Sequence, residues 1–97
     1  MRQVFFTPDA VRQLKRLPGA ARPLVRNAIT LHLANEDPTV ETRNRFRLRR
    51  LSEHADYELR AGEWRVFYRV SSNRVIITLI GEKRGNRLIV EGEGIQL

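Results

Sequence analysis

The chain has 97 residues, no cysteine, two histidines and a net charge of +7. This length predicts one small domain, spanning residues 1–97, and the lack of cysteine excludes disulfides, thiol catalysis and Cys-based zinc sites. His32 and His54 are far apart in the chain, so we expect no metal site and no cofactor. The sequence contains neither a run of about 18 apolar residues, as a membrane span needs, nor an apolar signal core. We therefore expect a cytoplasmic protein without a membrane segment.

The positive charge is concentrated in the first half of the chain. Residues 1–50 hold eleven Arg or Lys against four acids, whereas residues 51–97 hold seven against seven. Sixteen of the eighteen cations are arginine, whose planar guanidinium suits phosphate, although an arginine-rich genome would give the same preference. The charge favours a polyanionic partner, with nucleic acid first.

The N-terminal part predicts a strand followed by two helices. Residues 3–6 ("QVFF") form the strand, Thr7-Pro8-Asp9 begins the first helix, and Pro18-Gly19 ends it. A second helix is expected from about residue 20 to residue 35, which gives an αα-hairpin. The apolar residues expected to face the core are Val11, Leu14, Leu17, Leu24, Val25, Ala28, Ile29, Leu31 and Leu33.

After Pro38 the apolar residues recur with the period of strands. Strands are predicted over residues 46–51, 57–61, 64–70 and 74–80, followed by a loop over 81–85, one more short strand over 86–90 and a turn at "EGEG". The expected fold class is α+β, with the helical hairpin packed on one face of a mainly antiparallel sheet of four to five strands.

The segment "TRNRFRLRR", residues 42–50, alternates arginine with other residues. This period of two predicts a strand with Asn44, Phe46 and Leu48 turned inward and an outer face lined with guanidinium groups. That face is a candidate RNA-binding surface, and its residues are Arg43, Arg45, Arg47, Arg49 and Arg50. Charges that protect an edge strand from aggregation would explain the same pattern.

A second cluster of charged side chains is expected in the hairpin "YELRAGEWRVFYRV". If Gly62-Glu63 is a two-residue type II′ turn, Arg60 lies opposite Arg65, and Glu58 projects from the same face. Opposed arginines repel, and a bound phosphate would relieve the repulsion. A solvated face on which Glu58 neutralises the arginines remains the alternative. Lys83 and Arg84, in the expected loop, would close the site.

The order and spacing of these motifs resemble the RelE/ParE superfamily of bacterial toxin–antitoxin toxins. The resemblance rests on Leu59-Arg60, Trp64–Tyr68 and Gly81–Arg84, together with the N-terminal "FTPDAVRQLKRLP". It implies a toxin of a type II system with a cognate antitoxin. RelE-type members cleave mRNA in the ribosomal A site without metal, whereas ParE-type members poison DNA gyrase. The family's strand arginine falls on Arg65, and its basic residue after the glycine falls on Lys83 or Arg84.

Two other family positions differ in this chain. The lysines of RelE fall on Asp56 and Glu58, and its C-terminal tyrosine falls on Leu88 or Ile89.

The leading functional hypothesis is a metal-free, ribosome-dependent mRNA endonuclease whose partners are the ribosome, mRNA and an antitoxin. Arg65, with Arg60 or Arg84, would stabilise charge on the reacting phosphate. Glu58 is the candidate base, His54 the second choice, and Lys83 or Arg84 the acid. The alternatives are a gyrase poison and a non-catalytic module that binds antitoxin or RNA.

Overall fold

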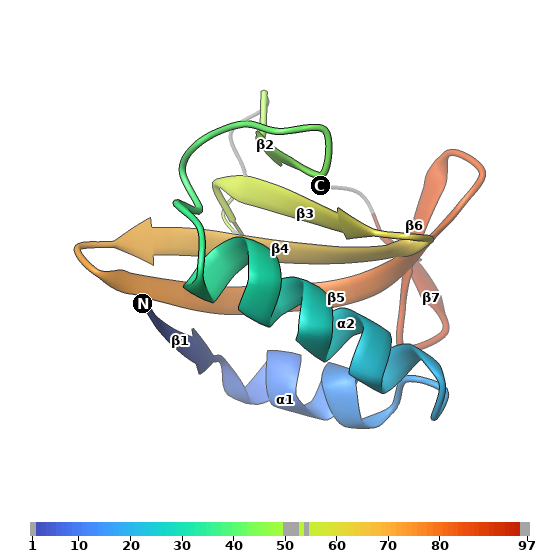
Figure 1. Cartoon of the computed structure of the whole chain (residues 1–97). Coiled ribbons are helices and arrows are strands. Elements are labelled where there is room, and N and C mark those ends of the chain that lie inside the picture. The colour runs from blue at the N-terminus through green and yellow to red at the C-terminus, as the bar shows by residue number, and fades with distance from the viewer. Residues whose placement is uncertain (1, 50–52, 54, 96–97) are drawn as a thin grey trace.

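The computed structural model describes residues 2–49, 53 and 55–95 of the chain. Two helices lie across one face of a twisted sheet (Figure 1), which confirms the predicted α+β class. The elements in chain order are β1 (Gln3–Phe6), α1 (Pro8–Lys15), α2 (Ala21–Ile29), a π-helical turn η1 (Thr30–Ala34), β2 (Arg45–Arg47), β3 (Tyr57–Ala61), β4 (Trp64–Ser71), β5 (Arg74–Arg84), β6 (Arg87–Val90) and β7 (Glu93–Ile95).

Within the described residues the sheet has seven strands, more than the four to five expected. Strands β2 to β7 follow one another in antiparallel order, and β1 pairs in parallel with β5. The first half of β5 pairs with β1, and its end at residues 82–84 pairs with β6. A turn at Glu91-Gly92, with φ of 51° and 86°, then returns the chain as β7.

The predicted loop over residues 81–85 is wrong, because β5 continues through Gly81 to Arg84. A Cβ at Gly81 would lie 2.8 Å from the carbonyl oxygen of Ile89 and 2.9 Å from Cγ2 of Val90. Glycine is therefore present here because β6 approaches closely.

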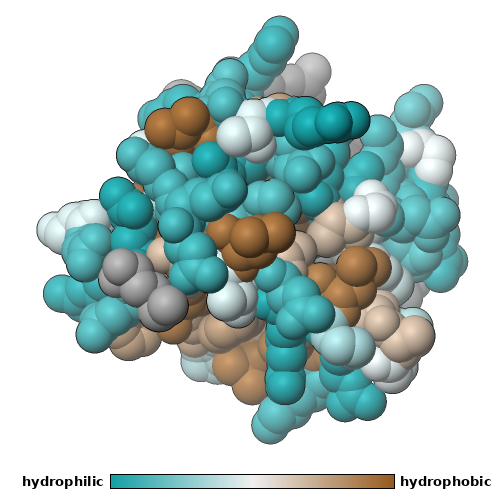
Figure 2. Space-filling model, viewed as in Figure 1, coloured by the Kyte–Doolittle hydropathy of each residue, from teal (hydrophilic) through white to brown (hydrophobic). Residues whose placement is uncertain are grey.

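The helical hairpin begins as its sequence predicts. Oγ1 of Thr7 accepts a hydrogen bond of 3.2 Å from the Ala10 N–H, and Pro8 occupies the first turn of α1. Val25, Ile29 and Leu33, each four residues from the next, are buried against the sheet. The predicted apolar stripe was too wide, because Leu24 and Leu31 are 49% and 53% exposed, and Val11 is also exposed. Figure 2 shows apolar side chains gathered in the centre and lower part of a face that is otherwise largely polar.

Two apolar clusters cover the two faces of the sheet unequally. The larger cluster lies between the sheet and the helices, where the Tyr68 hydroxyl donates to the Pro38 carbonyl at 2.7 Å. The smaller cluster lies on the other face and consists of Ala55, Phe67, Leu79 and Val90, with Leu48, Leu88 and Ile95 packed against it. Polar residues at positions 58, 60 and 65 lie on this second face, which no helix covers.

Among the residues described, no helix combines the length and the hydropathy of a membrane span.

Candidate functional site

The β3–β4 hairpin has the predicted register at every pair. Arg60 lies opposite Arg65, and the other pairs are Tyr57 with Tyr68, Glu58 with Phe67, Leu59 with Val66, and Ala61 with Trp64. Gly62 has a φ of 62°, the positive value that a type II′ turn requires at its first position. The two arginines and Glu58 therefore project from the same face, away from the helices.

One carboxylate lies between the two guanidinium groups. Oε2 of Glu58 is 3.0 Å from Nε of Arg60 and 3.5 Å from Nε of Arg65. Glu58 and Arg65 have side chains only 16% and 11% exposed, whereas Arg60 is 45% exposed. Two cations share a single anion, so the cluster keeps a net positive charge that is open to solvent mainly at Arg60.

Arg65 is fixed by the turn beside it. Its Nη1 donates to the carbonyl oxygens of Gly62 at 2.7 Å and Trp64 at 2.9 Å. Burial lowers the pKa of Arg65, the positive charge of Arg60 lowers it further, and Glu58 acts in the opposite direction. An arginine remains charged at neutral pH even so. Arg65 is therefore a cation whose position is fixed by its two hydrogen bonds to the turn.

Arg60 is held by β2. Its backbone N–H donates to the carbonyl of Asn44 at 2.7 Å, and its guanidinium carbon lies 4.4 Å from the centre of the Phe46 ring. Beside it, an open groove of about 360 Å³ lies over the paired strands β2 and β3. The residues that line the groove are Glu41, Phe46, Arg47, Leu48, Arg49, Glu58 and Arg60.

The groove joins the two predicted charge clusters in part. Arg49 from the arginine run lines the groove together with Glu58 and Arg60 from the hairpin. Arg47 pairs with Tyr57, so its side chain lies on the same face as Arg45, where Nη1 donates to the Tyr57 hydroxyl at 3.0 Å and the guanidinium carbon lies 5.3 Å from the centre of the Tyr57 ring. Arg43 is exposed ahead of β2. Arg50 and the second-choice base His54 lie outside the described residues, so their predicted roles remain predictions.

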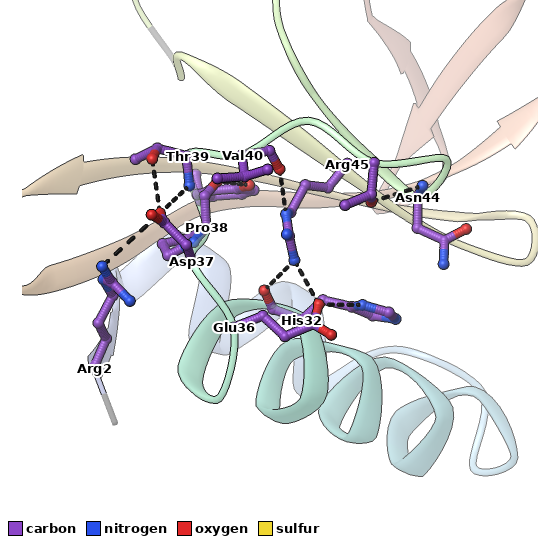
Figure 3. Close-up of polar contacts among 11 residues, drawn as sticks. Arg2, His32, Glu36, Asp37, Pro38, Thr39, Val40, Asn44 and Arg45 are labelled. Atoms are coloured by element: carbon purple, nitrogen blue, oxygen red, sulfur yellow. Dashed lines mark hydrogen bonds and ion pairs between the residues drawn. The ribbon is translucent and has the colours of Figure 1, made fainter.

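The prediction that Arg45 lines the exposed face is wrong. Arg45 is 3% exposed, its Nε donates to the Val40 carbonyl, and its Nη1 donates to the His32 carbonyl and to Oε1 of Glu36, each at 2.7 Å (Figure 3). The reason is its pairing with Leu59, which places Arg45 on the helix-covered face. The hydrogen bond from Arg45, and next that from His32, lowers the pKa of Glu36.

The same pairing turns Phe46 outward. Phe46 lies opposite Glu58 and lines the groove, although the alternation in the sequence predicted it to face inward. Alternation alone could not show which face of the short strand β2 points to the helices, because its three residues gave no apolar majority.

Lys83 and Arg84 lie on opposite faces of β5. Arg65 pairs with Gly81, so Lys83, two residues on, shares the face of Arg65, and its backbone N–H donates to the Glu63 carbonyl at 2.8 Å. Arg84 shares the other face with Glu82, and its Nε lies 3.0 Å from Oε1 of that residue. The expectation that Arg84 closes the site is therefore wrong, and Lys83 alone is suitably placed.

No cluster of three or more histidine or acidic side chains suited to a metal occurs in the described part of the chain.

Comparison with known proteins gives a match among solved structures. No family model and no curated protein matches the sequence. Among solved structures, a chain from the crystal structure of the toxin–antitoxin complex RelBE2 of Mycobacterium tuberculosis matches with a TM-score of 0.70 and 26% identity. The match covers 84% of this chain and 91% of that chain. The chain is RelE-like. The resemblance predicted from the motifs is thus confirmed, together with the fold class.

The resemblance predicted functional positions at Arg65 and at Lys83 or Arg84, and of these Arg65 and Lys83 lie on the open face of the sheet. The three groove residues that the sequence did not indicate are Phe46, Leu48 and Glu41. Glu41 precedes β2, and its Oε1 accepts a hydrogen bond of 3.1 Å from the Arg47 N–H. No spacing signal links this loop residue to the hairpin, which it reaches only because β2 pairs with β3.

Proposed function

We propose that this chain is the toxin of a type II toxin–antitoxin pair and that it cleaves mRNA on the ribosome without a metal ion. The observation that carries the proposal is the pair Arg60–Arg65, opposed on an open sheet face around the single carboxylate of Glu58, in a RelE-like fold. Like charges directly opposite each other destabilise a sheet by up to about 1 kcal/mol, and a bound phosphate would offset this cost.

In the proposed reaction the 2′-hydroxyl of the RNA attacks the adjacent phosphorus, and the bond from phosphorus to the 5′-oxygen breaks. The products are a 2′,3′-cyclic phosphate and a free 5′-hydroxyl. Arg65 stabilises the additional negative charge on the phosphate. Its Nη1 is already bonded to two carbonyls, so the guanidinium does not have to reorganise as that charge develops.

Two proton transfers complete the step. Glu58 accepts the proton of the 2′-hydroxyl, and Lys83, on the same face as Arg65, donates a proton to the leaving 5′-oxygen. Exchange with water then restores both groups. Arg49, along the groove, binds a neighbouring phosphate and helps to set the position of the RNA strand.

The proposed partners follow from this surface. The ribosome and its mRNA supply phosphates, and the antitoxin supplies an acidic segment that covers the groove and so excludes RNA. The match to a chain of a toxin–antitoxin complex supports an antitoxin partner. Translation takes place in the cytoplasm, and we place the protein there.

One observation favours a second candidate, a binding module without catalysis. Oε2 of Glu58 contacts both arginines, as expected of a residue that only balances charge. On that reading, Glu58 fixes the arginines for binding of RNA or antitoxin and no proton transfer occurs.

Primer extension on mRNA recovered from expressing cells separates these functions. We expect new 5′ ends with the parent protein, about 10²–10⁴-fold less cleavage with Glu58→Gln, and parental cleavage with Glu63→Gln, which changes an exposed glutamate of the adjacent turn. Equal cleavage by Glu58→Gln would remove Glu58 as the base. No new ends with the parent, together with an induced DNA-damage response, would instead indicate a gyrase poison.

A further inference from the structure

Arg60 and Arg65 are held in different ways, and the difference indicates different ligands. Arg65 is 11% exposed and bonded to backbone carbonyls of the turn. Arg60 is 45% exposed and lies with its guanidinium carbon 4.4 Å from the centre of the Phe46 ring. Its Nε is already occupied by Oε2 of Glu58 at 3.0 Å.

A guanidinium bound in this way is suited to stacking. The ring of Phe46 covers one side of the group, and Glu58 takes the Nε donor, which removes one of the two guanidinium edges that could make a two-pronged phosphate contact. Unpaired RNA bases stack on aromatic rings and on guanidinium planes, whichever base is present. The exposed part of Arg60 is therefore better placed to stack on a base than to clamp a phosphate.

The groove provides the remaining walls of such a subsite. Phe46 and Leu48 supply apolar surface, and Arg49 supplies a cation for the backbone of the same nucleotide. The groove has a volume of about 360 Å³ and is open to solvent, so it is accessible to an extruded base.

We propose that the groove over β2 and β3 is a nucleobase subsite, in which one unpaired RNA base stacks on the Arg60–Phe46 pair while Arg65 binds the scissile phosphate. The inference rests on the proposed function and deepens it. Arg60 then positions the substrate by stacking on its base, and Phe46 supports the guanidinium of Arg60 from the other side.

The test measures binding of the full chain to ribosomes programmed with a short mRNA. The A-site codon carries 2′-deoxynucleotides, which prevents cleavage, and each codon position in turn is replaced by an abasic nucleotide. We expect one position at which loss of the base weakens binding by roughly 5- to 150-fold, the range for a single stacked base.

The variants separate stacking from charge. Arg60→Lys keeps the charge, and Phe46→Leu keeps apolar bulk. With each variant, the affinities for intact RNA and for RNA that is abasic at that position should differ by less than about 2-fold. Arg49→Gln, the matched control, should weaken binding to both RNAs equally and keep the preference for the base. Arg60→Lys also serves as the informative variant if Phe46→Leu fails to fold.

Two results would overturn the inference, and they differ. Equal affinity of the parent for intact and abasic RNA at every position would remove the nucleobase subsite and leave the proposed function standing. No binding of the parent to programmed ribosomes would remove the proposed function, and the subsite with it.

Discussion

Arg60 and Arg65 face each other across the β3–β4 hairpin, and one oxygen of Glu58 contacts both guanidinium groups. The pair is asymmetric, because Arg65 is anchored to the turn and Arg60 lies over Phe46. Arg60 would therefore act on the substrate through its exposed plane, whereas Arg65 would act through its partly shielded N–H groups. Substitutions at the two positions are accordingly expected to have different effects.

Arg65→Ala should abolish translation arrest, because it removes the cation assigned to the scissile phosphate. The loss of hydrogen bonds to Gly62 and Trp64 should lower the free energy of unfolding by about 1 kcal/mol, offset in part by relief of repulsion from Arg60. Translation in induced cells and urea unfolding measure the two effects. A loss of several kcal/mol would show that Arg65 is mainly structural, and retained arrest would remove its assigned role.

Arg45→Met should be strongly destabilising. It leaves the carbonyls of His32 and Val40 without their donor, and we expect a loss of about 2–4 kcal/mol in the free energy of unfolding. Arg43→Met is the matched control, since Arg43 is exposed, and it should change stability by less than about 0.5 kcal/mol. Equal unfolding midpoints for both variants would contradict the anchoring role of Arg45.

The affinity of the chain for RNA should fall linearly with salt on a double-logarithmic plot. Arg49→Gln should reduce the slope by about 1, because Arg49 lines the groove and is assigned to a phosphate. Arg22→Gln makes the same change of charge on α2, across the molecule, and should leave the slope unchanged. Fluorescence anisotropy with a labelled single-stranded RNA gives both values. Equal slopes for the two variants would indicate a general effect of net charge.

Gly81→Ala should destabilise the protein by about 1–3 kcal/mol, because the added methyl would lie 2.8 Å from the Ile89 carbonyl and force β6 away from β5. Gly19→Ala is the control, since a Cβ there would meet only Arg22, at 3.9 Å. Thermal unfolding of the two variants makes the comparison. A Gly81→Ala protein that unfolds at the same temperature as the parent would show that β6 can move away from β5 without a loss of stability.

Stability should fall in acid. Hydrogen bonds from Arg12 to Glu91 and from Arg45 to Glu36 lower the pKa of each carboxyl from 4.5. A carboxyl with a lowered folded-state pKa stabilises the protein above its unfolded-state pKa, and this contribution disappears as pH falls through the folded value. The urea midpoint should thus drop below about pH 4.5, and Glu91→Gln should flatten the drop. Glu93→Gln, a change at an exposed glutamate of β7, is the control and should leave the pH profile of the urea midpoint as in the parent. Identical profiles for Glu91→Gln and the parent would show that Glu91 does not contribute to the loss of stability in acid.

The hairpin and the helix start could be predicted because each depends on a few adjacent residues. A two-residue turn at Gly62-Glu63 fixes every pair of β3 with β4 by counting, and the Thr7 cap satisfies an N–H only three residues away. The local chemistry therefore determines the place of Arg60, Arg65 and Glu58 without knowledge of the remaining fold.

The errors arose where a distant segment decides the outcome. Arg45 is buried because η1 and the following loop offer acceptors, and no local pattern marks it among five arginines. Gly81 was read as a turn signal, yet it serves the close approach of β6. The consequence extended to Arg84, whose side of the sheet depends on whether β5 continues through the glycine.

The parallel pairing of β1 with β5 has a consequence for the order of folding. β1 leaves the ribosome first during synthesis, but its partner strand follows both helices and three other strands. The hairpins from β3 to β6 join near neighbours in the chain and can form early, whereas closing β1 onto β5 costs the entropy of a long loop. The nascent chain therefore cannot complete its core until β5 has emerged, so the helices and the first strands wait unpacked for a strand that is made later.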